Sequence, residues 1–191
     1  MVGRYLLPFI WNKRNASLND STLTQLELEA NDKVLDIGCG GGYLIGKMIE
    51  QATVRHISGI DASAEIVEHC GSLFSRSIKD CYLDIQCAKV DALPYSHDHF
   101  SKACSVNSIF YWPDLLRGLR EIYRVLASNG LLVLTYTSKH DLDKQGFFPD
   151  DVRSYRDEEV TGALRSEKFH DVFLKQEADK HRSYSIVTAR K

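Results

Sequence analysis

The stretch that decides the fold reads KVLDIGCGGGY and runs from Lys33 to Tyr43. It opens with a short, mostly apolar run typical of a buried strand, after which four of the five residues at 38–42 are glycine. Apolar residues then recur at helical spacing up to Ile49, so the stretch predicts a strand, a tight turn and a helix. Ligands bind at the carboxyl ends of the strands in open α/β sheets, which makes this turn the first candidate site.

Strand-like and helix-like segments alternate along the rest of the chain. Ser63 and Asp114 are each placed to cap a helix, and Asn129-Gly130 is expected to end the second of these helices. The alternation predicts an α/β fold, an open sheet of mostly parallel strands with helices on both faces and an antiparallel β-hairpin near the C-terminus. Strands are expected at residues 33–37, 56–61, 83–87, 103–109, 131–136, 172–176 and 184–189, and helices at 44–49, 64–74, 115–126 and from 157 onward.

The length and composition are those of one globular domain. The chain has 191 residues, of which 43% are hydrophobic and 26% charged, with four prolines and no Gly/Ser-rich linker. We therefore expect a single domain over residues 1–191, in which residues 1–30 form an N-terminal lid or helical segment. The formal net charge of −2 lacks the basic excess that phosphate contacts require, which argues against nucleic acid as a partner.

The cysteines and the apolar runs bear on the compartment. Five cysteines occur without any C-x-x-C pair, so we expect neither a disulfide framework nor a metal site, and a reducing, cytoplasmic location is favoured. No apolar run reaches the roughly 18–20 residues of a transmembrane helix, and the apolar residues 5–11 lack a signal-peptide cleavage site. A weak contact between this N-terminal segment and a membrane is compatible with the sequence.

Two ligand classes compete for the glycine-rich turn. The dinucleotide pattern G-x-G-x-x-G would need its third glycine at Tyr43 or at Ile45, depending on the register, so it fails in both registers. An acid, Asp61, ends the next predicted strand, where a carboxylate can accept hydrogen bonds from both hydroxyls of a ribose. A nucleoside-containing ligand is therefore favoured over a turn that is glycine-rich for structural reasons alone.

Four segments in this order resemble class I S-adenosylmethionine-dependent methyltransferases. They are VLDIGCGGG at 34–42, GIDAS at 59–63, VDALPY at 90–95, and REIYRVL with NGLL between 120 and 132. The combination is similar to the branch that includes ubiquinone and menaquinone C-methyltransferases (methyltransferase type 11), and it extends over roughly residues 12–191. The resemblance implies a Rossmann-like sheet, with S-adenosylmethionine as the cofactor and S-adenosylhomocysteine as its product.

The resemblance also implies how the cofactor binds. Asp36 would hold its amino group, Asp61 its ribose hydroxyls and Asp91 its adenine amino group. Ile66 and Leu93 would form apolar walls beside the adenine. In full, the residues expected to bind the cofactor are Asp36, Gly38, Cys39, Gly40, Asp61, Ala62, Ile66, Asp91, Ala92, Leu93 and Asn107.

The same resemblance implies in-line transfer of a methyl group to a small-molecule acceptor, by a monomer or a homodimer. Alignment of the reactants supplies much of the catalysis in such a displacement, so no residue is assigned as a catalytic base. The residues expected beside the acceptor or in a lid over it are Trp11, Asn15, Tyr111 and His140. Two alternatives stay open: a non-catalytic S-adenosylmethionine-binding or interaction protein on the same fold, and a protein methyltransferase.

Overall fold

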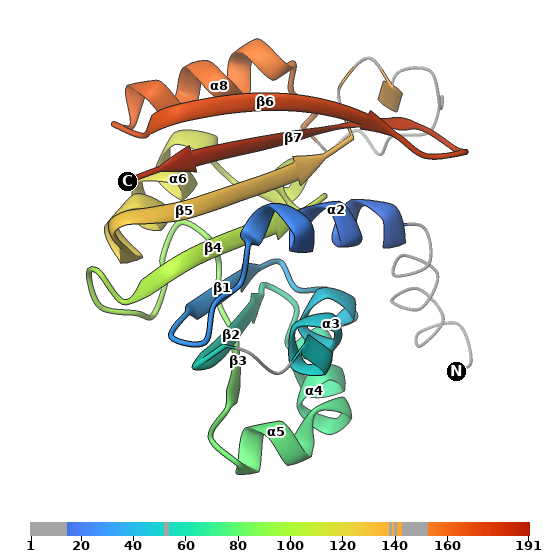
Figure 1. Cartoon of the computed structure of the whole chain (residues 1–191), viewed down its shortest axis with the longest axis vertical. Helices are drawn as coiled ribbons and strands as arrows, with labels where there is room; N and C mark the ends of the chain where they lie inside the picture. The colour runs from blue at the N-terminus through green and yellow to red at the C-terminus, as the bar shows by residue number, and fades with distance from the viewer. Residues whose placement is uncertain (1–14, 52–53, 138, 140, 143–152) are drawn as a thin grey trace.

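A seven-stranded sheet with strand order β3-β2-β1-β4-β5-β7-β6 organises the chain (Figure 1). The computed structural model describes residues 15–51, 54–137, 139, 141–142 and 153–191. β1 to β5 run parallel, and β7 runs antiparallel to both of its neighbours. The strands are β1 (Lys33–Ile37), β2 (His56–Asp61), β3 (Leu83–Cys87), β4 (Phe100–Val106), β5 (Leu126–Tyr136), β6 (His170–Ala178) and β7 (Ser183–Arg190). The helices are α2 (Ala16–Leu26), α3 (Tyr43–Gln51), α4 (Ala64–Leu73), α5 (Ser75–Lys79), η1 (Ile109–Tyr111), α6 (Leu115–Val125) and α8 (Asp157–Ser166).

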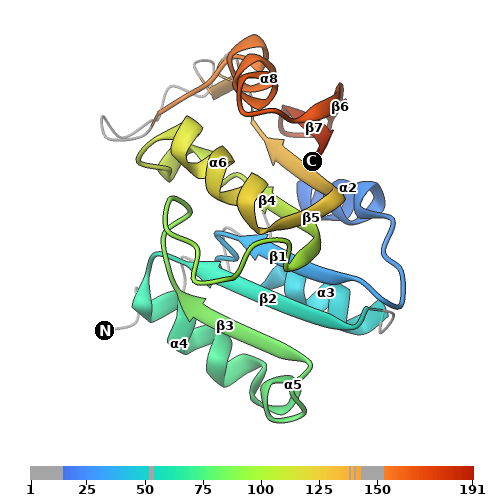
Figure 2. The ribbon, with the colours of Figure 1, turned by 90° about the vertical axis from the view of Figure 1, so that its left-hand side faces the viewer.

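Helices cover both faces of this sheet (Figure 2). α2, α3, α4 and α5 lie on one face, and α6 and α8 lie on the other. Neighbouring residues of β1 alternate between the two layers, since Val34 packs into the core under α2 and α3 and Leu35 into the core under α6. Both side chains are fully buried, which explains why this strand is almost continuously apolar. The expected fold, an open α/β sheet with a C-terminal antiparallel hairpin, is confirmed.

The fourth strand lies three residues earlier than the sequence pattern predicts. β4 ends at Val106 because Asn107 adopts a φ of +51°, which takes the chain out of the extended conformation. Ile109 then begins the short 3₁₀ helix η1 instead of ending a strand. The predicted strand at residues 103–109 is confirmed over 103–106, but its predicted end at Ile109 was wrong. Ile109 and Phe110 are buried, and a buried helical turn is as apolar as a strand.

The helix that precedes β5 also ends earlier than predicted. α6 stops at Val125, and β5 begins at the next residue, so Asn129-Gly130 does not end a helix. Instead it interrupts β5, where Asn129 has a φ of +61° and the pairing with β4 shifts register. An Asn-Gly pair suits the left-handed backbone conformation both at the end of a helix and at an irregularity within a strand. Local sequence therefore does not distinguish these two structures.

The connection from β3 to β4 contains no helix over its residues 88–99, all of which are described. Two side chains of α6 hold it in place. The Leu93 amide donates to Glu121 Oε2 at 3.0 Å, and Arg124 donates to the carbonyls of Leu93 at 3.0 Å and Tyr95 at 2.7 Å. A hydrogen bond from Arg124 also holds the pKa of Glu121 below its usual value. The REIYRVL segment therefore carries the side chains that anchor the VDALPY segment.

α2 belongs to the core of the sheet. Leu18 and Leu26 are fully buried in the core cluster that includes Val34, and α2 packs against β4 and β5. The sequence analysis expected a lid or helical segment over residues 1–30 without giving the bounds of a helix, and α2 lies within that range. Residues 1–14 of the expected N-terminal lid lie outside the described residues.

Candidate active site

A cavity of about 1320 Å³ opens along the carboxyl ends of the parallel strands, and we call it the sheet-edge cavity. This volume exceeds the roughly 300–1,000 Å³ that is typical of a site for one small ligand. Its wall includes residues that follow β1, β2, β3, β4 and β5, together with Arg182 from the turn between β6 and β7. Ten of the residues expected at the site line it, namely Asn15, Asp36, Gly38, Cys39, Gly40, Asp61, Ala62, Ile66, Asn107 and Tyr111.

The glycine-rich turn forms a wall of backbone beside this cavity. Gly38, Gly40 and Gly42 have φ values of +72°, +52° and +75°, which residues with a side chain rarely adopt. A Cβ at Gly38 would also lie 2.4 Å from the Cβ of Ser108. The Ser108 hydroxyl donates to the Ile37 carbonyl at 3.0 Å, so the chain after β4 closes directly against the turn. Because the glycines carry no side chains, a ligand can approach the backbone of this turn closely.

Asp61 ties the glycine-rich turn to the next helix. Its Oδ2 accepts a hydrogen bond from the Gly40 amide at 3.1 Å, and its Oδ1 accepts one from the Ser63 amide at 2.9 Å. Ser63 caps α4 by accepting from the Ile66 amide at 3.4 Å, which confirms the predicted cap. Each carboxylate oxygen can accept two hydrogen bonds, so Asp61 retains capacity for two further donors at the cavity wall.

Asp36, in β1, is a buried acid with an unsatisfied hydrogen-bond acceptor. It is 2% exposed, its Oδ2 has no hydrogen-bond partner, and its Oδ1 has the Cys104 thiol at 4.0 Å. Burial raises the pKa of Asp36 to about 7, and the nearby Asp61 carboxylate adds to the rise. Buried polar atoms are almost always paired in proteins, so this oxygen marks a place for a donor from a ligand, best a cationic one.

Four polar residues from distant parts of the chain meet at the other end of the cavity. Asn107 accepts at Oδ1 from the Thr137 amide at 2.9 Å and donates through Nδ2 to Asn15 Oδ1 at 3.0 Å. The same Asn15 oxygen accepts from Arg182 Nη2 at 2.6 Å. The Thr137 side chain is fully buried, and its hydroxyl has no hydrogen-bond partner. This network, which we call the Asn107 network, joins β4, β5, the start of α2 and the β6–β7 turn.

Aromatic side chains from residues 110–112, which follow Asn107 in the chain, also line the cavity. Phe110 and Trp112 line the cavity and are buried, and the Trp112 indole donates to the Ser108 hydroxyl at 3.1 Å. Tyr111 also lines the cavity but is 66% exposed. The cavity therefore offers an apolar, aromatic surface as well as hydrogen-bond donors.

The structure does not bring every predicted residue to the cavity. Asp91, Ala92 and Leu93 do not line it, although the preceding residue Val90 does. Leu93 is buried in the core below α6, and Asp91 Oδ2 lies 3.7 Å from Arg117 Nη2. Their predicted contacts with adenine stay predictions. Trp11 and His140 lie outside the described residues.

Thr137, Arg182 and Asn19 line the cavity but were missed by sequence reasoning. Thr137 follows directly after β5, so the rule that sites lie at the carboxyl ends of strands could have found it. No local signal marks Arg182, which lies in a hairpin turn, or Asn19, which lies on the buried side of α2.

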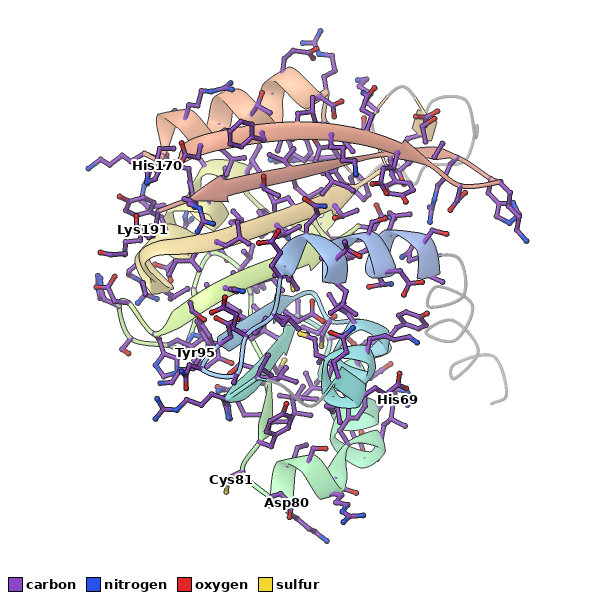
Figure 3. All side chains as sticks on the ribbon, viewed as in Figure 1. His69, Asp80, Cys81, Tyr95, His170 and Lys191 are labelled. Atoms are coloured by element: carbon purple, nitrogen blue, oxygen red, sulfur yellow. The ribbon has the colours of Figure 1, made fainter. Side chains whose placement is uncertain are left out.

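A second polar cluster lies outside the cavity. The Asp84 carboxylate accepts four hydrogen bonds, which use its full capacity and keep its pKa below the usual value despite burial. Figure 3 shows Tyr95 of this cluster on the opposite side of the molecule from His69, which lines the cavity. The donors to Asp84 are Ser58 Oγ at 2.5 Å, His56 Nε2 at 2.7 Å, Gln86 Nε2 at 3.0 Å and Tyr95 Oη at 3.0 Å.

Comparison with known families agrees with this arrangement. The family described as "Methyltransferase domain" matches residues 35–134, which contain the glycine-rich turn and both helix-cap predictions. The chain belongs to this family. It is an S-adenosylmethionine-dependent methyltransferase on a Rossmann-like sheet, as the sequence motifs predicted.

Two relatives illustrate the range of the family. The uncharacterized methyltransferase YdaC of Bacillus subtilis (strain 168) is 28% identical over 127 residues, which are 66% of this chain and 68% of YdaC. The chloroplastic 2-methyl-6-phytyl-1,4-hydroquinone methyltransferase 1 of Oryza sativa subsp. japonica is 28% identical over 167 residues. These residues are 83% of this chain and 48% of the rice protein, so the chain spans about half the length of that relative.

Solved structures share the fold. A Haloferax volcanii protein in complex with the Trm112 methyltransferase activator has a TM-score of 0.82 at 18% identity, covering 96% of this chain and 92% of that chain. The [4+2]-cyclase SpnF has a TM-score of 0.80 at 20% identity, covering 95% and 83%. At these identities the likeness concerns the fold alone.

The residues around the turn fit S-adenosylmethionine. This donor carries an amino group, a ribose with two hydroxyls and a sulfonium. Asp36 offers an unpaired carboxylate oxygen, Asp61 can accept further hydrogen bonds, and the turn leaves room beside its backbone.

Within the described ranges, no helix is long and apolar enough to span a membrane.

Proposed function

We propose that the protein transfers a methyl group from S-adenosylmethionine to a small organic molecule held beside the Asn107 network. The observation that carries this proposal is the sheet-edge cavity itself. Its volume exceeds that of a site for one ligand, its acids belong to β1, β2 and α4, and its lining also includes aromatic side chains and the Asn107 network. Named relatives include hydroquinone methyltransferases and 27-O-demethylrifamycin SV methyltransferase of Amycolatopsis mediterranei, which supports a small-molecule acceptor.

In this proposal Asp36 and Asp61 bind different parts of the cofactor. The unpaired Asp36 oxygen receives the cationic amino group, and Asp61 receives the ribose hydroxyls while it holds the turn through Gly40. Gly38 and Cys39 contact the amino-acid end. The adenine lies toward β3 in this proposal, which is supported by Ala62 and Ile66, two residues after β2 that line the wall on that side.

The cofactor supplies a methyl group that is already activated for attack. The chain has to orient the acceptor and exclude water, and such alignment is worth up to about 7–11 kcal/mol. The Asn107 network provides fixed donors for orientation, and Phe110, Trp112 and Tyr111 provide an apolar wall. The acceptor roles expected for Trp11 and His140, and the adenine roles of Asp91 and Ala92, belong to the proposal as predictions.

A melting experiment tests the cofactor part of the proposal. S-adenosylhomocysteine at 100 times its dissociation constant should add about 2.7 kcal/mol of stability, whereas NADH should add none. For a chain of this length that raises the melting temperature by about 5–11 °C. No shift, or a larger shift with NADH, contradicts the assignment.

A transfer experiment tests the acceptor part. The protein is incubated with S-adenosylmethionine that carries a labelled methyl group, together with a substituted hydroquinone, a peptide mixture or a short RNA. We expect label in the hydroquinone arm only. Label confined to the peptides would favour a protein methyltransferase, and cofactor binding with no transfer to any acceptor would favour a binding protein.

We further propose that the protein acts in the cytoplasm as a monomer or a homodimer. The support is the set of five cysteines without C-x-x-C spacing, which suits a reducing compartment. Light scattering on the purified chain measures the oligomeric state directly.

A further inference from the structure

Charge is divided unevenly along the sheet-edge cavity. The acids that line it, Asp36, Asp61, Glu65 and Glu68, belong to β1, β2 and α4. Of the lysines and arginines in the described residues, two line it, and they stand at opposite ends of the sheet. Lys89 follows β3, and Arg182 precedes β7, five strand spacings away, or about 24 Å.

Arg182 therefore stands at the acceptor end. If the cofactor extends from β3 to β1, as the acids indicate, the wall beyond β4 is left for the acceptor. Arg182 is fixed there through Asn15, and its backbone amide donates to Asp179 Oδ1 at 3.0 Å within the same turn. A guanidinium has five donors in a rigid fork, which suits recognition of an anionic oxygen.

Thr137 is an independent sign of a ligand at the same end. Its hydroxyl is buried, lacks a partner and belongs to a residue that lines the cavity. Its backbone amide is already bonded to Asn107, so the side chain alone is left to bind a ligand. A buried hydroxyl without a partner costs free energy unless a ligand or water satisfies it.

We propose that Arg182 and Thr137 form a subsite for a negatively charged oxygen of the acceptor, and that the acceptor is an aromatic alcohol bound as its phenolate. Phe110 and Tyr111 line the same cavity and offer the ring an aromatic face to lie against. The acceptor would lose its phenolic proton to solvent when it binds. Ionisation makes the whole ring system more electron-rich than a phenol, so no catalytic base would be needed at the moment of transfer. This inference rests on the proposed function and assigns its acceptor class.

The test uses 4-nitrophenol as the probe, because its phenolate is yellow and its phenol is colourless. The full chain, with and without S-adenosylhomocysteine, is titrated with the probe over a range of pH. We expect the protein to bind the phenolate at least tenfold more tightly than the phenol. The apparent pKa of the bound probe then falls by at least about one unit.

Matched variants decide whether the subsite is the cause. Arg182→Gln should remove most of the preference for phenolate, and Thr137→Val, which keeps the side-chain shape, should reduce it less. Arg182→Lys should restore part of it. Lys180→Gln is the control, since Lys180 is an exposed residue of the same turn and does not line the cavity. Melting temperatures close to that of the unchanged protein show that each variant is folded.

Two outcomes overturn the inference. One is equal binding of phenol and phenolate by the unchanged protein, or no binding of either. The other is an unaltered preference in Arg182→Gln. Failure of the proposed function is detected separately, because it would leave the melting temperature unaffected by S-adenosylhomocysteine.

Discussion

The two ends of β1 carry one buried aspartate each, and their surroundings differ. Asp32, which precedes the strand and is 7% exposed, accepts from Ser101 Oγ at 2.7 Å and the Glu29 amide at 2.7 Å. Lys102 Nζ lies 2.8 Å from it. Asp36, near the carboxyl end and 2% exposed, has an oxygen with no partner at all. Asp32 at the amino end finds its hydrogen-bond and ion-pair partners within the protein. Asp36 at the carboxyl end has an oxygen that only a ligand would pair.

Asp32 and Asp36 are only four positions apart in the chain, so a stabilising residue and a ligand-binding residue lie at the two ends of one short strand. The Asp32 cluster ties β1 to β4, because Ser101 and Lys102 belong to that strand. Asp36 instead is a buried carboxyl group, and its burial in the folded protein disfavours the ionised form. Substitutions of Asp32 and of Asp36 should therefore have opposite effects on the stability of the protein without ligand.

The largest effect is expected at the amino end. Asp32→Ala removes the acceptor for Ser101 and the Glu29 amide and leaves Lys102 without its ion-pair partner. Breaking a buried pair on one side costs about 3–5 kcal/mol, so the melting temperature should fall by about 6–20 °C. Scanning calorimetry measures this.

The control for that experiment is an exposed acid. Asp80→Ala removes a carboxylate at the end of α5 that lies 4.0 Å from Arg76, and Figure 3 shows Asp80 at the edge of the molecule. It should change stability by no more than about 0.5 kcal/mol. Equal effects of the two substitutions would remove the contrast between the ends of β1.

The next effect is expected at the carboxyl end of the neighbouring strand. Asp61→Ala removes a carboxylate that would bind the ribose and that also holds the Gly40 and Ser63 amides. Two lost hydrogen bonds to a charged group lower cofactor affinity by about 100-fold or more. Calorimetric titration with S-adenosylhomocysteine measures the loss. Unchanged affinity would show that the ribose lies elsewhere.

Asp36→Asn should stabilise the protein without ligand. The pKa of Asp36 is about 7 in the folded protein and 3.8 ordinarily, so the folded state holds the proton more tightly. Ionisation therefore costs stability as the pH rises from about 4 to 7, and the full cost is present above 7. Part of it is offset by burying an amide, so we expect a gain of about 1–2 kcal/mol at pH 8 that vanishes toward pH 4.

Denaturant unfolding at several pH values measures this gain. The same variant should bind S-adenosylhomocysteine less tightly, since the cationic amino group loses its partner. A variant that is destabilised at pH 8, or that binds the ligand normally, would contradict the assignment of Asp36 to the ligand.

The smallest effect concerns pH and cofactor affinity in the unchanged protein. A cationic amino group binds the ionised Asp36, so below pH 7 binding has to release a proton from this carboxyl. Affinity for S-adenosylhomocysteine should rise by up to about tenfold between pH 6 and pH 8. The rise should be absent in Asp36→Asn. An identical pH dependence in the variant would assign the effect to another group.

Sequence patterns predicted the fold well where the cause is local. The strand that ends at Asp61, the cap at Ser63 and the cap at Asp114 were all correct, because each depends on a few neighbouring residues. The predicted ends of the fourth strand and of the following helix were wrong, and in each case an asparagine with a positive φ lies at the site of the error. Asn107 ends β4 early in order to bridge two strands and α2, and Asn129 interrupts β5.

The sequence by itself determined the strand, turn and helix at residues 33–51, the acids at the strand ends and the family to which the chain belongs. Only the tertiary structure decided that Asp36 is left with an unpaired oxygen and that Arg182 reaches the cavity. Arg182 and Asn15 are 167 residues apart in the chain, and an antiparallel hairpin at the far edge of the sheet brings them to hydrogen-bond distance. Local patterns report interactions within a few residues, whereas burial and contacts across the sheet arise only when the whole chain has packed.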